Sequence, residues 1–285
     1  MLVITADPSQ KLRALQAGAK DFISKPFELA EVQVRVHNML EVRLLHMETK
    51  ASSLALEQLN RNLQQLVQEQ VREYSDAQLA TIMAISKLAE ARDDNTGKHL
   101  ERTRTFCRLL AWQLQTRSAC AAVVDDAFVD NLFHASPLHD IGKVAIKDRI
   151  LLKPGTLTPY EFNIIKTHTL IGAATLQEVH DRYPLNDFIT MGIQVARSHH
   201  EKWDGSGYPD GLVADEIPFS AQIMALADVY DALRSKRPYK EAYTHEQSRE
   251  ILINGRGQHF SPAVVDAFIV QEQEFDRVYS VLADL

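Results

Sequence analysis

Histidine and aspartate side chains that could bind metal ions gather in the second half of the sequence. Seven of the 11 histidines fall between His99 and His200. The combinations that stand out are His139-Asp140, His168, His199-His200 and, further along, Asp228. Asp228 lies among apolar neighbours, where a carboxylate costs several kcal/mol unless it is paired or metal-bound. An internal ion pair would satisfy one such aspartate, but imidazoles and carboxylates from several helices together predict a metal centre.

The type of donor atom limits which metal ions this centre can hold. Asp140 has two carboxylate oxygens and could bridge two ions about 3.5–4 Å apart, the separation used by two-metal hydrolases. With only Cys107 and Cys120 in the chain, a cysteine-based zinc site is excluded. Nitrogen and oxygen donors suit iron, manganese or nickel, with zinc as an alternative. We therefore expect two divalent transition-metal ions.

Helix signals place these residues on separate helices. The segment Thr158–Glu161 reads as a capping box with proline at the first helical position, and it begins the helix that carries His168. Further helices are expected from near Asp125 to the His139-Asp140 pair, from Asn186 to His199-His200, from Pro218 to about Leu233, and from Ser261-Pro262 onward. No alternating strand pattern appears after about residue 80. The fold class predicted for this region is mainly α, an all-α helical bundle.

The beginning of the chain has a different character. An apolar strand at residues 2–6, a helix after Asp7-Pro8-Ser9 and a second strand at Asp21–Ser24 predict a β-α-β unit. Between Pro26 and Gly97 there is neither glycine nor proline, which predicts a long helix. The expected domains are residues 1–40, a partial α/β unit; 41–80, a helical linker; and 81–285, the catalytic bundle.

The middle of the long helix carries a seam of leucines that suggests self-association. Leu56, Leu59, Leu63 and Leu66 are spaced three, four and three residues apart, with polar residues between them. This spacing is typical of a coiled coil and predicts a homodimer through the linker helix. The alternative is a single amphipathic helix that packs on its own domain.

Composition and charge exclude several classes of protein. The 285 residues include 45% hydrophobic and 24% charged residues, ordinary values for a globular protein. A net charge of -7 argues against coating of nucleic acid or of an anionic membrane. We find no run of about 18 apolar residues and no signal peptide, and two cysteines fit a reducing compartment. The expectation is a cytoplasmic protein without nucleic-acid or membrane partners.

Two segments resemble a known family. HDIGK at residues 139–143, followed by HHEKWDGSGYP at residues 199–209, is similar to the HD-GYP phosphodiesterases, a branch of the metal-dependent HD phosphohydrolases. The resemblance covers roughly residues 82–262. It implies an all-α domain with two or three metal ions. It also implies hydrolysis of cyclic di-GMP, a bacterial second messenger, to linear pGpG, with GMP as the alternative final product.

The resemblance assigns roles to residues by position. The metal ligands it implies are His99, His139, Asp140, His168, His199, His200 and Asp228. His139, Asp140 and Lys143 would carry the catalysis, with Lys143 over a substrate phosphate. The substrate contacts it implies are Lys143, Tyr208, Arg237, Lys240 and Asp93. Asn95 stands where members with three metals have a glutamate, so two ions are expected and a third is not.

Residues 1–40 resemble the C-terminal half of a response-regulator receiver domain, with Lys25-Pro26 matching the pair that ends its last strand. The acidic cluster and the phosphoacceptor aspartate of that family are absent from the sequence. This resemblance implies two-component signalling, with a sensor kinase acting on the intact receiver. The HD-GYP resemblance also implies docking of diguanylate cyclase (GGDEF) domains at the loop Gly205–Pro209.

Two other functions remain open from the residues alone. One is an HD hydrolase of another cyclic dinucleotide or of a nucleotide. The other is a sensor or docking module that binds cyclic di-GMP without hydrolysing it.

Overall fold

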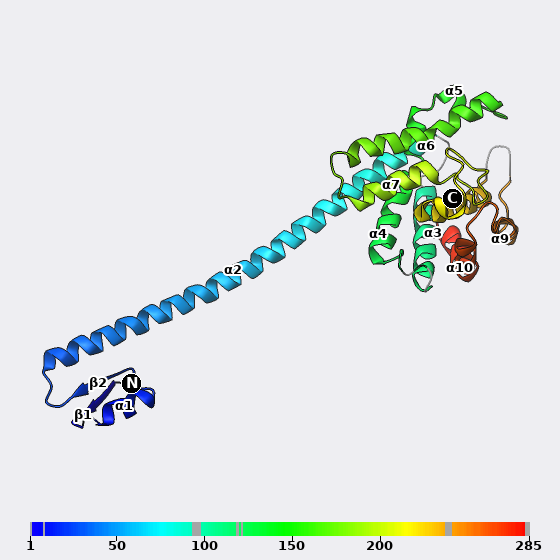
Figure 1. The fold of residues 1–285 in the computed structure, drawn as a ribbon. Helices are drawn as coiled ribbons and strands as arrows, with labels where there is room; N and C mark the ends of the chain where they lie inside the picture. The colour runs from blue at the N-terminus through cyan, green and yellow to red at the C-terminus, as the bar shows by residue number, and fades with distance from the viewer. Residues whose placement is uncertain are drawn as a thin grey trace. The chain divides into compact units, whose positions relative to one another are not determined.

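The structure of this chain is a computed structural model that describes residues 2–7, 9–92, 98–117, 120, 122–236 and 241–282. Contacts divide it into two units, Met1–Asp76 and Ala77–Leu285, and helix α2 (Leu29–Glu90) contributes to both. The described residues are mainly helical, which confirms the predicted fold class (Figure 1). Among these residues, no helix has the length and apolar character needed to cross a membrane.

The first unit begins with the predicted β-α-β arrangement. Strand β1 (Leu2–Thr5) pairs in parallel with β2 (Asp21–Ser24), and helix α1 (Ser9–Gln16) connects them. The Asp7 carboxylate accepts a hydrogen bond from the Ser9 amide, so it caps α1 at its start. Ile23 of β2 is fully buried. The unit therefore has the order of elements that the sequence predicted.

Helix α2 extends over 62 residues, in line with the absence of glycine and proline from its sequence. The four leucines of the predicted seam are each about half exposed or more, at 49–59% of their surface: Leu56, Leu59, Leu63 and Leu66. Only near its C-terminal end does the helix contribute buried side chains, which are Ser86, Ala89 and Glu90.

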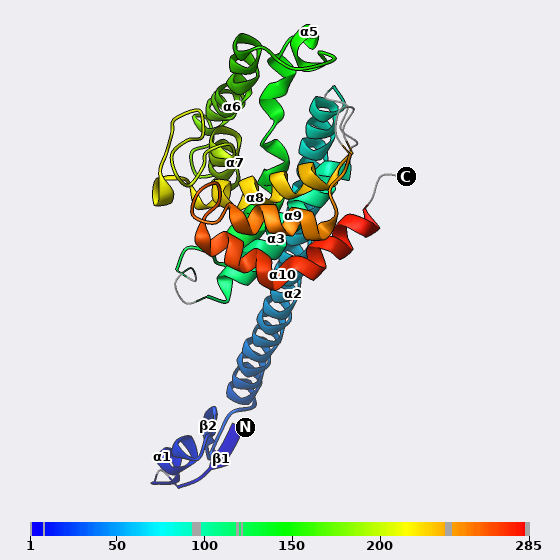
Figure 2. The ribbon, with the colours of Figure 1, turned by 90° about the vertical axis from the view of Figure 1, so that its right-hand side faces the viewer.

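The second unit is a bundle of helices joined by short turns (Figure 2). After α2 its helices are α3 (Lys98–Gln115), α4 (Asp126–Ala135), α5 (Asp148–Leu151), α6 (Pro159–His180), α7 (Asp187–Ser198), α8 (Phe219–Arg234), α9 (His245–Asn254) and α10 (Pro262–Val281). Short 3-10 turns are η1 (Ser136–Leu138), η2 (Ile141–Ala145) and η3 (Ala214–Glu216). Helix α3 packs against α4, α8 and α10, while α6 packs against α7 and η2. The core between α3, α8 and α10 contains the stacked rings of Phe106 and Phe275, which both meet the Tyr230 ring edge-on.

The predicted helix starts are confirmed by their caps. Thr158 accepts a hydrogen bond from the Glu161 amide, and the Glu161 carboxylate accepts one from the Thr158 amide, which completes the capping box. The Asn186 side chain accepts from the Ile189 amide at the start of α7. Pro218 and Ser261 immediately precede α8 and α10. The side-chain caps fix the starts of α6 and α7, which lead to His168 and to His199-His200.

One helix ends earlier than predicted. The helix that was expected to run to His139-Asp140 stops at Ala135, and the pair lies between the 3-10 turns η1 and η2. Pro137 explains the change, because it has no amide hydrogen to donate to a helical carbonyl and its ring crowds the preceding turn. The pair consequently lies where the backbone changes direction.

A direct contact between backbones holds this turn against α6. A methyl group placed on Gly142 would lie 2.0 Å from the His168 carbonyl oxygen and 2.6 Å from the Gly172 amide nitrogen. Both atoms belong to the helix backbone, so neither can move aside cheaply. Only glycine allows η2 to approach α6 this closely.

We predict that Gly142→Ala lowers the free energy of unfolding of the bundle by about 2 kcal/mol or more, because the added carbon overpacks a backbone contact. Gly257→Ala serves as the control, since Gly257 has φ +75° but no atom within 4 Å of the added carbon. It should cost only backbone strain, about 1 kcal/mol. Urea unfolding followed by circular dichroism measures both. Equal losses in the two variants would contradict the close-contact explanation.

Candidate metal centre

Four residues from three segments of the bundle bring potential ligand atoms together. One donor atom each of Asp140, His168, His199 and His200 lies within 4.8 Å of the others. The Asp140 Oδ1 atom is 3.2 Å from His168 Nε2 and 3.7 Å from His199 Nε2. The two imidazole Nε2 atoms are 3.5 Å apart. We call these four residues the first cluster.

A second group of donor atoms adjoins the first. Glu90, His99 and His139 have ligand atoms within 4.8 Å of one another, and we call them the second cluster. Asp228 Oδ1 lies 3.6 Å from His99 Nε2 and 4.0 Å from His139 Nε2. His139 Nε2 is also 3.3 Å from Asp140 Oδ2. Asp140 therefore faces the first cluster with one oxygen and the second with the other.

Hydrogen bonds fix the orientation of the histidine rings. The Nδ1 atoms of three of them lie 2.7–2.9 Å from main-chain carbonyl oxygens: His139 at Ser136, His168 at Ile165 and His199 at Val195. A carbonyl oxygen can only accept, so each Nδ1 must carry the hydrogen. Each neutral ring then presents a bare Nε2 lone pair, the form that binds a metal ion.

His99 is held by a carboxylate instead of a carbonyl. Its Nδ1 lies 2.7 Å from Asp231 Oδ2, and the Arg102 guanidinium binds both oxygens of Asp231. All three side chains are buried. Burial opposes the charged ring, but Asp231 and Glu90 together raise the pKa of His99 to about 9. The surroundings of its Nε2 atom are thus strongly negative and favour a cation.

The two clusters contain buried donor atoms that the described protein leaves without hydrogen bonds. These atoms are Asp140 Oδ1, His139 Nε2 and both carboxylate oxygens of Glu90. Leaving such groups unpaired in the interior is costly. Bound divalent ions would satisfy the four unpaired atoms of the clusters. The residues present therefore fit a metal centre.

The charges around the first cluster also suit metal binding. Burial raises the pKa of Asp140, but the nearby Lys143 and His139 outweigh it and hold that pKa well below its usual range. Burial lowers the pKa of His200 to about 4 and that of His199 well below its usual value. The carboxylate is therefore ionised and the two rings are neutral at physiological pH. In the second cluster, burial raises the pKa of Glu90 to about 7.

Lys143 stands beside the clusters as the sequence predicted. Its Nζ atom lies 2.7 Å from Asp140 Oδ2, one turn of η2 away, and its side chain is largely buried. The ammonium group thus adds a positive charge next to the carboxylate that both clusters share.

The loop after His200 is built around Glu201. This buried carboxylate accepts hydrogen bonds from the amides of Asp210, Gly211 and Leu212 at 2.7–3.2 Å. Arg197 of α7 also binds both oxygens of Asp210 at 2.8 Å. The loop is therefore fixed to the end of α7, next to His199 and His200.

An aromatic side chain of this loop and two side chains of α6 lie beside the first cluster. The Tyr208 ring stacks on the His200 ring, with centroids 4.8 Å apart. The Lys166 ammonium lies 5.0 Å from the Tyr208 ring centre and 4.8 Å from that of Phe162. A planar ligand ring and an anionic group could both be bound here, because the site offers an aromatic face beside a cation.

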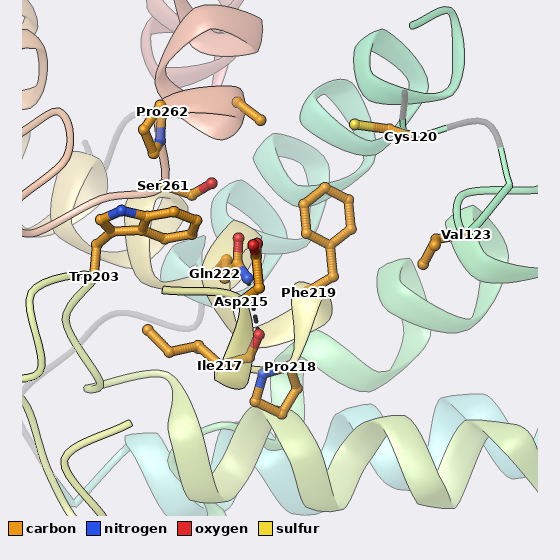
Figure 3. A pocket seen from close by; sticks show the side chains of 11 residues that line it. Cys120, Val123, Trp203, Asp215, Ile217, Pro218, Phe219, Gln222, Ser261 and Pro262 are labelled. Carbon is orange, nitrogen blue, oxygen red and sulfur yellow. Dashed lines mark hydrogen bonds between the residues drawn. The ribbon is translucent and has the colours of Figure 1, made fainter. Parts of the chain in front are cut away.

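A cavity of about 460 Å³ lies elsewhere in the bundle (Figure 3). Trp203, Phe219 and Gln222 line it, and Gln222 donates a hydrogen bond to the Ile217 carbonyl. None of the residues of the two clusters lines this cavity. The metal centre and this cavity are separate features.

The structure brings together every predicted metal-ligand residue. His139, Asp140, His168, His199 and His200 lie in the clusters, His99 lies in the second cluster, and Asp228 lies at its edge. Lys143 and Tyr208 adjoin them. Asp93, Arg237 and Lys240, predicted to contact substrate, lie outside the described residues, as does Asn95, whose neutral side chain argued against a third ion.

Sequence reasoning missed three residues of this region: Glu90, Asp231 and Glu201. Glu90 lies with Ser86 and Ala89 on the buried face of α2. Like Asp228, it is a carboxylate on the buried side of a helix, and this is the signal that could have identified it. Asp231 is one helical turn after Asp228 on α8. Glu201 gave no comparable signal, because its role depends on a loop whose path the sequence does not reveal.

We predict that Glu201→Ala releases the loop. Hydrogen bonds to a charged acceptor contribute about 1.5–3 kcal/mol each, so amide exchange at residues 210–212 should accelerate at least about tenfold. Hydrogen–deuterium exchange with mass spectrometry measures this change. Glu216→Ala is the control, because the Glu216 carboxylate accepts from the Val213 amide alone in this loop. Unchanged exchange at residues 210–212 would contradict the role given to Glu201.

Comparison with known proteins identifies the family of the bundle. Residues 83–264 match the family model described as "HD domain". The chain is 41% identical over 280 residues to a "Probable cyclic di-GMP phosphodiesterase" of Vibrio cholerae serotype O1, covering 98% of this chain and 62% of that protein. It thus spans less than two thirds of the length of that relative.

Two further relatives differ in name. Over 278 residues the chain is 38% identical to the "Cyclic di-GMP phosphodiesterase response regulator RpfG" of Xanthomonas campestris pv. campestris, covering 98% of this chain and 68% of that protein. Over 200 residues it is 40% identical to the "3'3'-cGAMP-specific phosphodiesterase 2" of Vibrio cholerae, covering 70% and 36%. The family model spans well over half of the chain and includes every residue of both clusters. The chain therefore belongs to the HD domain family.

Proposed function

We propose that this chain is a metal-dependent phosphodiesterase that hydrolyses cyclic di-GMP to linear pGpG, with GMP as a further product. The observation that carries the proposal is the convergence of two donor clusters on Asp140, with Lys143 beside it. The similarity to relatives named cyclic di-GMP phosphodiesterases supports the choice of substrate. The GYP segment at residues 207–209 supports placement in the HD-GYP branch.

The ligands we assign are His139, Asp140, His168, His199, His200, Asp228 and His99. They would hold two divalent ions, of iron, manganese or nickel, with zinc as an alternative. When bound, such ions supply Lewis-acid chemistry and an activated water at neutral pH. Asp140 would bridge the two positions, since each of its oxygens faces a different cluster.

The remaining residues act on the substrate. Water attacks phosphorus in line with the ribose 3′ oxygen, which leaves as the ring of the dinucleotide opens. Lys143 would stabilise the negative charge that develops on the non-bridging phosphate oxygens. Tyr208 would stack on a guanine base or contact a phosphate, since its ring already covers His200. Asp93, Arg237 and Lys240 complete the proposed contacts with the substrate.

The rest of the chain is proposed to carry regulation. Residues 1–40 would be the C-terminal half of a receiver domain, residues 41–80 a coiled-coil linker, and residues 81–285 the HD-GYP domain. The parallel β-α-β unit and the relative named as a response regulator support this division. A sensor kinase would act on the intact receiver, and a GGDEF domain would dock at the GYP loop. The proposed location is the cytoplasm.

A related cyclic dinucleotide is the second candidate substrate. The similarity to a 3'3'-cGAMP-specific phosphodiesterase favours it, because the two substrates share the phosphodiester ring and one guanine. A sensor that does not hydrolyse its ligand is disfavoured, since simple binding has no need of so many converging metal donors.

The substrate proposal is tested with manganese-loaded protein and a panel of nucleotides. The panel contains cyclic di-GMP, 3'3'-cGAMP, pGpG and a nucleotide monophosphate, and chromatography separates the products. We expect cyclic di-GMP to give pGpG with the highest kcat/KM. Faster turnover of 3'3'-cGAMP would select the second candidate, and binding without product would select the sensor.

Asp140→Ala should reduce kcat by at least about a thousandfold, because it removes the carboxylate shared by both clusters. Far-UV circular dichroism should remain that of a helical protein. Asp130→Ala provides the control, since Asp130 is an exposed residue of α4 outside both clusters. Wild-type activity in metal-loaded Asp140→Ala would refute the metal-hydrolase proposal.

The proposed dimer is tested on the leucine seam. Leu59→Lys should shift the protein toward monomer in multi-angle light scattering, because a coiled-coil seam does not tolerate an unpaired charge. Leu54→Lys is the matched control: Leu54 is equally exposed but lies on the opposite side of the helix. A wild-type protein that stays monomeric at high concentration would exclude the coiled-coil dimer.

A further inference from the structure

We propose that Glu90 is a metal ligand, and that its carboxylate binds the ion held by His99 and His139. The inference rests on the proposed metal-dependent function and adds to it a residue outside the HD and GYP segments. Glu90 is the last residue of α2, so the ligand comes from a helix to which the sequence assigned no chemical role.

The first argument is the burial of a carboxylate that has no hydrogen bond. Glu90 is 3% exposed, and neither of its carboxylate oxygens forms a hydrogen bond with any residue that the structure describes. A carboxylate in the interior is strongly destabilising unless a cation or hydrogen-bond donors compensate it. A metal ion facing Glu90 would provide this compensation.

The second argument is geometric. Glu90 Oε1 lies 3.4 Å from His99 Nε2, and the donor atoms of Glu90, His99 and His139 lie within 4.8 Å of one another. Two donors that each lie about 2.1 Å from one ion are about 3.0–3.4 Å apart at octahedral to tetrahedral angles. The spacing between Glu90 and His99 is that of two ligands of one ion.

The third argument is the orientation of both rings. Asp231 occupies Nδ1 of His99, and the Ser136 carbonyl occupies Nδ1 of His139. Their Nε2 atoms therefore face Glu90, and a metal ion bound there would take their lone pairs in place of a proton. A simple ion pair between Glu90 and protonated His99 would still leave His139 Nε2 without a hydrogen bond to any residue that the structure describes.

Charge balance supports a divalent ion in this position. With Asp228 Oδ1 3.6 Å from His99 Nε2, the position has two carboxylates and two imidazoles around it. Two negative charges compensate one divalent ion, and this mixture of nitrogen and oxygen donors suits manganese or iron. Glu90 thus gives the His99 side of the centre a second carboxylate.

The test compares Glu90→Gln with wild type by metal binding alone. Both proteins are stripped with a chelator, equilibrated with Mn²⁺ and assayed by elemental analysis and by competition with a chromogenic chelator. We expect Glu90→Gln to lose one equivalent of Mn²⁺, or to bind it at least about tenfold more weakly, and to keep the other equivalent. Glu73→Gln, an exposed position on the same helix, should bind as wild type does.

Thermal unfolding separates a ligand from a structural ion pair. Without metal, Glu90→Gln should unfold at the wild-type temperature or above it, because a buried carboxylate without hydrogen bonds is replaced by a neutral amide. With Mn²⁺, its gain in Tm should be smaller than that of wild type. Unchanged Mn²⁺ binding together with a lower metal-free Tm would overturn the proposal and assign Glu90 to a pair with His99.

A second variant keeps the test decisive if Glu90→Gln does not fold. Glu90→Asp retains the charge but shortens the side chain by one carbon, and weaker Mn²⁺ binding is again expected. Unchanged binding in Glu90→Asp would overturn the proposal. No nucleotide enters these measurements, so a failure of the cyclic di-GMP assignment would leave their outcome unaffected.

Discussion

The removal of imidazole rings and carboxylates from water is the constraint on which the rest of this bundle depends. In three of the rings the buried Nδ1 atom finds its hydrogen-bond partner locally. It donates to a main-chain carbonyl three or four residues earlier in its own segment. The helical backbone thus supplies the acceptor without any additional side chain. This leaves every Nε2 atom facing inward, where only another ring, a carboxylate or an ion can satisfy it.

The positions of the ligands follow from where the helices end. His139 and Asp140 lie between two 3-10 turns, and His199 and His200 follow the end of α7. At such ends the backbone leaves helical geometry, so adjacent side chains can point at one centre. The first turn of α3 and the interiors of α6 and α8 add single ligands from fixed directions. The combination surrounds Asp140, with Lys143 beside its carboxylate and Tyr208 stacked on His200.

Much of this arrangement could be predicted from the sequence, because its signals are local. Capping residues such as Thr158 and Asn186 mark helix starts, and the histidines stand out by type. Glu90 could not be assigned in the same way, since a lone glutamate on a buried stripe is usually one half of an ion pair. Its meaning depends on His99 and His139, which come from other segments. Helix α4 ends before the predicted position because Pro137 lacks an amide hydrogen and cannot continue the helix.

The contact between Gly142 and the backbone of α6 has a consequence for metal preference. At this contact the main chains of η2 and α6 touch directly and set the distance from Asp140 to His168. No side chain lies between them whose size a substitution could change. A substitution that widened the centre, such as Gly142→Ala, would have to force these two backbones apart and would destabilise the bundle. A change of preferred metal in this scaffold would have to come from exchanging the donor atoms themselves, nitrogen for oxygen or sulfur, on a frame of constant size.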